Sequence, residues 1–159
     1  ALLVITLLAI GLYFHEMPRG EEKLFWLRLH ISIGAAAGVL LLFRVSWRML
    51  TASPQSIYQG RRVAVVERWG HRLMLLLIVV LVLSGPLMVW SGGRPVHIFD
   101  WVTLAAPFGK WNALHEVLEV VHGLSSRLLL ILVIGHVLMA IKHRLLDRDG
   151  SLGRMIGSS

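Results

Sequence analysis

The stretch from His122 to His136 reads His-GLSSRLLLILVIG-His, with two histidines fourteen residues apart at the ends of a strongly apolar run. In a helix of 3.6 residues per turn, fourteen residues make almost four turns, so both imidazoles leave one face about 21 Å apart along the axis. That separation is comparable with the depth of a membrane's hydrocarbon core. The spacing predicts a membrane helix that carries two stacked sites.

The composition favours an integral membrane protein over a water-soluble domain. Of the 159 residues, 56% are hydrophobic, and the mean hydropathy is +0.71. Cysteine is absent, which excludes disulfides, iron–sulfur clusters and covalently attached haem. The formal net charge of +7 comes from basic residues at the ends of apolar segments. This pattern indicates membrane topology and not nucleic-acid binding.

Four apolar segments predict an all-α membrane protein with a single domain, residues 1–159, built as a four-transmembrane-helix bundle. The segments are Ala1 to Phe14, Phe25 to Trp47, His71 to Trp90 and Leu114 to Ile141. The last three each reach the ~20 residues that a helix needs to cross the hydrocarbon core. The first rises only about 21 Å. We therefore expect the first helix to be truncated, with about six residues missing upstream.

The distribution of Lys and Arg between the connections predicts the orientation of the chain. The connection between the second and third segments and the C-terminal tail are rich in basic residues: Arg48, Arg61, Arg62, Arg68, Lys142, Arg144, Arg148 and Arg154. The other two connections contain few basic residues or balance them with acidic ones. We expect both termini to be cytoplasmic.

Three histidines, His30, His122 and His136, lie inside the predicted membrane helices. The second and fourth helices run in the same direction, so His30 and His122 lie at similar depths near the outer face and can face one another. Two neutral imidazoles complete the axial ligands of one haem iron. His136, about four turns deeper, is the candidate ligand of an inner haem. We expect the fourth ligand upstream of Ala1, and haems between the helices.

Each of these residues also has an ordinary alternative, which for a single histidine is a core residue with a satisfied hydrogen bond. Gly34, in a GAAAG run, lets either a porphyrin or another helix approach closely. Arg44 and Arg127 could neutralise haem propionates or extend to the membrane surface. His143 and His71, at the inner boundary, are candidates for a quinone site or are solvated helix ends.

Together the motifs resemble the bacterial cytochrome b-561 family, which is related to the cytochrome b subunits of membrane hydrogenases. The resemblance covers essentially the whole chain and rests on five stretches: ALLVITLLAIGLY, RLHISIGAAAGVLLLFRVSWR, WGHRLMLLLIVVLVLSGPLM, GGRPVHIFDW and IGHVLMAIKHRLLDRDGSLGRM. It implies a multi-pass protein of the bacterial inner membrane with two b haems. His30 and His122 would hold the outer haem. His136 would hold the inner one, with a histidine at the start of the first helix that has no counterpart here.

The resemblance also implies a function, which is transfer of single electrons between the periplasmic side and the quinone pool of a respiratory chain. The chain would be an oxidoreductase or its electron-transfer subunit, and no catalytic residue is assigned. One branch of the family oxidises superoxide, and His143 matches a position near its proposed quinone site. The donor or acceptor, a periplasmic protein or superoxide, stays open. The alternatives are a histidine-lined proton or metal transporter and a membrane anchor without a redox role.

Overall fold

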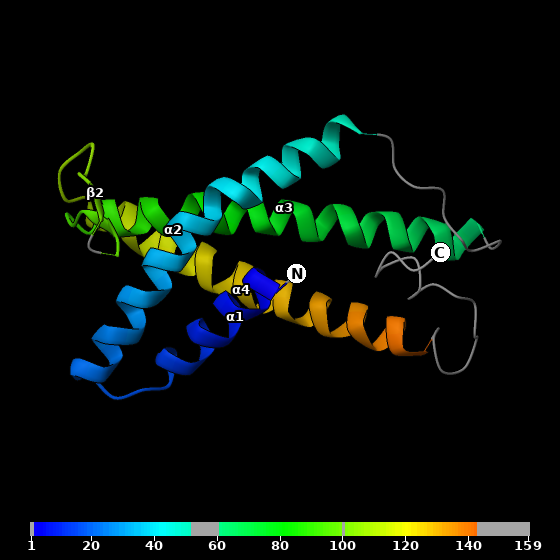
Figure 1. Cartoon of the computed structure of the whole chain (residues 1–159), viewed down its shortest axis with the longest axis horizontal. Coiled ribbons are helices and arrows are strands. Elements are labelled where there is room, and N and C mark those ends of the chain that lie inside the picture. Colours follow the sequence, from blue (N-terminus) through cyan, green and yellow to red (C-terminus); the bar gives the residue numbers. More distant parts are fainter. Residues whose placement is uncertain (1, 52–60, 100, 143–159) are drawn as a thin grey trace.

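The computed structural model describes residues 2–51, 61–99 and 101–142, and only the backbone of residues 61–64. Within these ranges the chain is helical apart from one short hairpin (Figure 1). The elements are α1 (Leu2–His15), α2 (Glu21–Leu50), α3 (Arg61–Ser91), β1 (Val96–Ile98), β2 (Val102–Leu104) and α4 (Asn112–Lys142).

Three of the helices have the length and hydropathy of membrane spans. These are α2, α4 and the Val65–Ser91 part of α3, whereas α1 is a shorter apolar helix. The 27 residues of the α3 span rise about 40 Å, more than the ~30 Å hydrocarbon core. The prediction of three full-length spans and one short first helix is confirmed. Both α2 and α3 begin earlier than their apolar segments, because Glu21 and Arg61 belong to the helices.

Helices α3 and α4 run antiparallel and lie side by side over most of their length (Figure 1). A small apolar core forms where α1 joins them, and it contains Leu8, Leu77 and Leu129. Leu129 is only 1% exposed. The short first helix therefore packs at mid-height against both long helices.

Helix α2 packs on α3 and approaches it closely at Gly38, where a Cβ would stand 3.1 Å from Cγ1 of Val82. A larger residue there would push the two helices apart. The outer faces of the helices remain apolar, as Leu40 and Phe43 of α2 show with exposed fractions of 61% and 67%. Such continuous apolar surface is suited to lipid and not to water.

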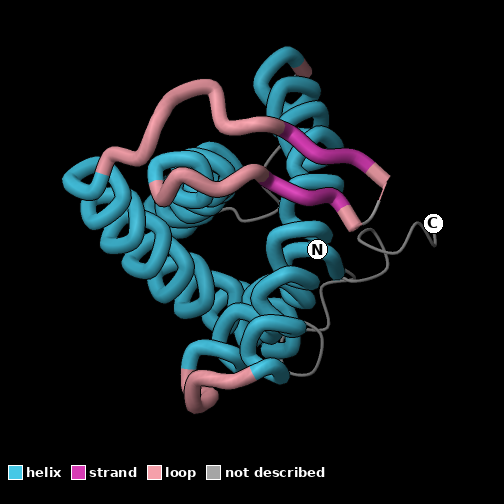
Figure 2. Tube along the Cα trace, turned by 90° about the vertical axis from the view of Figure 1, so that its left-hand side faces the viewer, coloured by secondary structure: helices cyan, strands magenta, loops and turns pink. Residues whose placement is uncertain are grey.

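The connection between α3 and α4 contains a two-stranded antiparallel hairpin, in which Val96 pairs with Leu104. The sequence does not predict this hairpin. It lies at one end of the helices (Figure 2). The buried Ser32 of α2 fastens it: the Ser32 hydroxyl donates to the His97 carbonyl at 3.1 Å and accepts from the Phe99 N–H at 3.0 Å. The hairpin thus covers the helix ends on the side of His30.

Candidate functional site

The rings of His30 on α2 and His122 on α4 face each other in the middle of the bundle. Their centroids are 6.3 Å apart, and the ring planes make an angle of 85°. Because α2 and α4 run in the same direction, residues near the start of each reach the same height. The structure therefore brings together the two histidines that the sequence analysis placed at matched depths.

Glycines on the two neighbouring helices make room for these imidazoles. A Cβ on Gly11 of α1 would stand 3.4 Å from Cε1 of His30, and one on Gly85 of α3 would stand 3.5 Å from Cε1 of His122. Phe14, one turn after Gly11, packs edge-on against the His30 ring at 5.5 Å. Each imidazole ring thus packs against a glycine of the neighbouring helix, where no side chain occupies the space that the ring needs.

The two rings differ in their hydrogen bonds. Nδ1 of His122 is 2.9 Å from the hydroxyl of Ser84. Nδ1 of His30 is buried and has no partner among the described residues, and the nearby Leu7 backbone forms no hydrogen bond of acceptable geometry with it. Packing against α1 is therefore what orients the His30 ring.

The spacing of the two rings fits an iron ion between them. With metal–Nε2 bonds of about 2.0 Å, the length typical of imidazole ligands, and each ring centre about 1 Å behind its Nε2, the centroids would be about 6 Å apart. The observed 6.3 Å agrees. The donor set is also that of a low-spin b haem, two neutral imidazoles in an apolar surrounding. The pair therefore fits such a group, which His30 and His122 would hold.

A second pair of histidines lies further along α4, where the partner helix is α3 and not α2. His71 of α3 and His136 of α4 have ring centroids 5.1 Å apart. Nδ1 of His71 is 3.0 Å from the carbonyl of Glu67, to which it donates. The sequence predicts no partner for His136 among the intramembrane histidines, and it makes His71 a candidate for a quinone site or a solvated helix end. The structure places the ring of His71 beside that of His136.

The antiparallel packing of α3 and α4 explains this contact. His71 and Ser84 are thirteen residues apart on α3, and the residues they face, His136 and His122, are fourteen apart on α4. Because the two helices keep this register over four turns, the position of one facing pair determines the other. The matching spacings are visible in the sequence, but they lead to this contact only when one facing pair of α3 and α4 is already known.

An iron ion does not fit between His71 and His136 as they stand, because their centroids are about 1 Å closer than two imidazole–metal bonds require. His71 is exposed, whereas His136 is partly buried. The pair is thus arranged differently from His30 and His122. The geometry supports His71 as a neighbour of His136 and does not make it the opposite axial ligand.

The remaining predicted site residues lie away from the facing rings or outside the described part of the chain. Gly34 faces Leu7 of α1, at 3.8 Å from its would-be Cβ, which agrees with the helix-packing alternative. Arg44 and Arg127 are both exposed on the helix surfaces. His143 lies outside the described residues.

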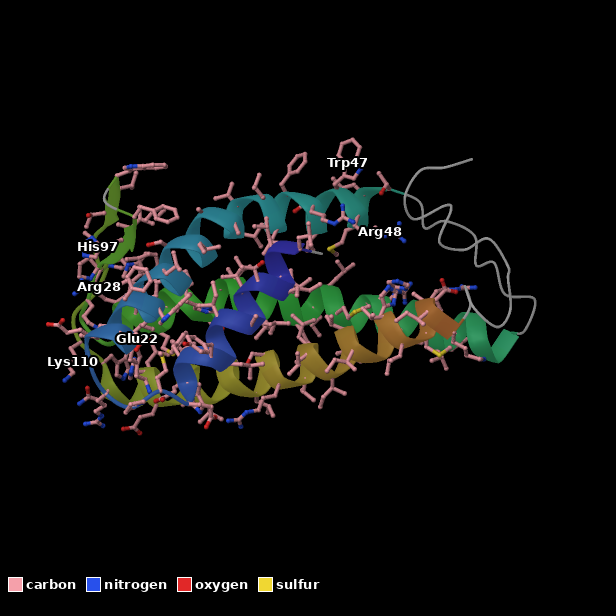
Figure 3. The ribbon with its side chains drawn as sticks, turned by 60° about the horizontal axis from the view of Figure 1, so that its bottom comes forward. Glu22, Arg28, Trp47, Arg48, His97 and Lys110 are labelled. Atoms are coloured by element: carbon pink, nitrogen blue, oxygen red, sulfur yellow. The ribbon has the colours of Figure 1, made fainter. Side chains whose placement is uncertain are left out.

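Polar side chains gather at the two ends of the bundle. Arg28, His97 and Lys110 lie at the end that carries the hairpin, whereas Arg48 lies near the other end of α2 (Figure 3). Between these ends, the described part of the chain contains no group of three or more His, Cys, Asp or Glu residues arranged to hold a metal ion.

A comparison with known families bears on this site. The model of the prokaryotic cytochrome b561 family matches residues 1–158. The chain belongs to this family. It is also similar to cytochrome b561 homolog 2 of Escherichia coli (strain K12), with 27% identity over 170 aligned positions that include all of this chain and 86% of the relative. This cytochrome b561 is thus a bacterial membrane protein of a haem b electron-transfer family, and the resemblance found in its motifs is confirmed.

Proposed function

We propose that this cytochrome b561 carries two b haems and moves single electrons across the cell inner membrane, between a donor or acceptor on the periplasmic side and the quinone pool. The observation that carries the proposal is the facing of His30 and His122, whose ring centroids are 6.3 Å apart. That separation supports the proposal because it is the spacing expected of two imidazoles on one iron.

The bound haem would supply one-electron redox chemistry, and the protein would supply its ligands and surroundings. In this proposal His30 and His122 would hold the outer haem. Gly11 and Gly85 leave space for their rings, and the apolar helices exclude water. His136, almost four turns along α4 from His122, is the ligand proposed for the inner haem.

The end of the bundle near His136 is where we place the quinone. His71 is exposed there and contacts His136. Its Nδ1 donates to the Glu67 carbonyl, so in the neutral ring Nε2 is left as a hydrogen-bond acceptor. A quinone arriving through the lipid could reach this position without entering the bundle. His143, which lies outside the described residues, is the next residue in the sequence after α4 and is a further candidate for this proposed site.

The opposite end, with the hairpin, is where we place the periplasmic redox partner. Arg28, Arg94 and Lys110 are exposed there and would attract an anionic partner, either a protein surface or superoxide. Lys23 does not add to this group in the same way, because its ammonium donates to the carbonyls of Met17 and His15 at 2.9 and 3.3 Å. It closes the turn between α1 and α2.

Optical spectra of the protein purified in detergent test the proposal. The dithionite-reduced protein should show the sharp α band of low-spin b haem, and extraction should yield two haems per chain. His122→Ala or His30→Ala should remove about half of the haem, because one of two bis-imidazole sites loses a ligand. His136→Ala should remove the other half, with a different component of the spectrum.

The matched control is His97→Ala, which removes an exposed histidine of the hairpin and should leave the haem content unchanged. A colourless wild-type protein would end the cytochrome proposal. Loss of the same spectral component in all three ligand variants would contradict the assignment of two sites.

A further inference from the structure

Two Ser-Gly dipeptides, one within α3 and one at its C-terminal end, each face one histidine of α4. Ser84-Gly85 lies against His122, and Ser91-Gly92 lies against His115, with would-be glycine Cβ atoms 3.5 Å from the imidazole Cε1 in both places. The two dipeptides are seven residues apart, and so are the two histidines. The antiparallel helices therefore repeat one arrangement, a serine beside Nδ1 and a glycine beneath the ring, two turns apart.

At the inner of these two places, the Ser84 hydroxyl can select which nitrogen of His122 carries the proton. The Ser84 hydroxyl is 3.4 Å from the Leu81 carbonyl, to which it donates, and 2.9 Å from Nδ1 of His122. A hydroxyl has one proton, and a carbonyl can only accept. With its proton directed at Leu81, Ser84 accepts from Nδ1–H. The tautomer this selects has an unprotonated Nε2, the form that can bind iron.

At the outer place the serine plays a smaller part. Nδ1 of His115 is 2.8 Å from the Met88 carbonyl and 3.4 Å from the Ser91 hydroxyl, and Ser91 donates to the same carbonyl at 3.0 Å. The backbone is therefore the principal acceptor for His115. For His122, in contrast, the hydroxyl of Ser84 is the one acceptor on Nδ1 in the described part of the chain.

We propose that Ser84 is a positioning residue for the outer haem: by accepting from Nδ1–H of His122 it selects the ligating tautomer and holds the ring nearly perpendicular to that of His30. The proposal rests on the proposed function, in which these two histidines are the axial ligands. A hydrogen bond at the far nitrogen makes a ligating imidazole a stronger electron donor. Ser84 therefore favours the ferric state, and His30, which has no such bond, does not contribute equally.

The test compares Ser84→Ala, Ser84→Thr and Ser91→Ala in the full chain, purified with its haem. The outer component is identified as the one that His122→Ala lacks. In Ser84→Ala the ratio of reduced to oxidised outer haem at a fixed potential should rise about three- to tenfold, as expected for one neutral hydrogen bond. For a one-electron couple this is an upward shift of about 30–60 mV.

The electron paramagnetic resonance spectrum of the ferric protein gives a second readout, because it depends on the angle between the two imidazole planes. The outer-haem signal should change in Ser84→Ala, as the His122 ring is free to turn. Ser84→Thr keeps the hydroxyl and should restore both the potential and the signal. Ser91→Ala removes an equally buried serine from the same helix and should leave both unchanged.

Ser84→Ala with wild-type haem content, potential and spectrum would overturn the proposal. If Ser84→Ala loses its outer haem, Ser84→Thr provides the test. A wild-type potential of the outer haem in Ser84→Thr supports the proposal, and a shifted potential contradicts it. A wild-type protein without haem would refute the proposed function itself, which separates that failure from the failure of the role given to Ser84.

Discussion

At the scale of single residues, the proposed outer site depends on glycines as well as on histidines. An imidazole that leans on a neighbouring helix needs a glycine there, and Gly11 and Gly85 provide this for His30 and His122. The histidines and their depths could be predicted from spacing in the sequence. The glycines opposite them could not, because they lie on other helices and become neighbours only through tertiary packing.

The room beneath His122 can be tested by filling it. A Cβ on Gly85 would make ordinary contact with the ring, so Gly85→Ala should keep the haem. The further carbons of Gly85→Leu would need the space of the ring itself and cost about 1–3 kcal/mol or displace His122. We expect Gly85→Leu to lose about half of the extractable haem. Gly70→Leu is the control, because a Cβ at Gly70 would have no atom within 4 Å. Its haem content should stay at the wild-type level.

At the scale of elements, what the sequence predicts well is whatever periodicity and length determine. The three spans follow from apolar runs, and the short first helix follows from its length. The hairpin was missed because its strands have three residues each and depend on an anchor from another helix. The contact of His71 with His136 and the bond of Ser84 to His122 were missed for a related reason. Both require the register of α3 against α4, which no single segment contains.

Ser32 is the anchor that a variant can remove. Its hydroxyl bonds both the His97 carbonyl and the Phe99 N–H, and Phe99 has a φ of 48°, a region that non-glycine residues seldom adopt. Ser32→Ala removes the acceptor of the partly buried Phe99 N–H, at a cost of about 1 kcal/mol. Amide hydrogen exchange in β1 and β2 should become faster while the haem spectrum stays the same.

The control for the hairpin experiment is Ser126→Ala, because the Ser126 hydroxyl donates only to the Gly123 carbonyl of its own helix. Exchange in the hairpin should be unaffected in that variant. If Ser32→Ala also left the hairpin exchange unchanged, the hairpin would be held by its strand pairing and not by α2.

At the scale of the whole molecule, the two ends of the bundle differ in what they expose. The end with the hairpin carries acidic and basic side chains together, including Glu22, Arg28 and Lys110 (Figure 3). The segments 48–68 and 142–159 contain eight basic residues, Arg48, Arg61, Arg62, Arg68, Lys142, Arg144, Arg148 and Arg154, against three acidic ones, Glu67, Asp147 and Asp149. Because basic segments are retained on the cytoplasmic side, this difference predicts that the His136 end faces the cytoplasm. An electron that enters near His122 and leaves near His136 would then travel inward.

Reporter fusions test this orientation in cells. Green fluorescent protein fused to the end of the chain should fluoresce, and alkaline phosphatase fused there should be inactive, because that enzyme folds only outside the cytoplasm. Phosphatase inserted at the turn between β1 and β2 should be active. Activity in the C-terminal fusion together with none in the hairpin insertion would reverse the orientation. It would place the His71 and His136 end on the periplasmic side, so the proposed quinone site and the proposed partner surface would have to exchange sides of the membrane.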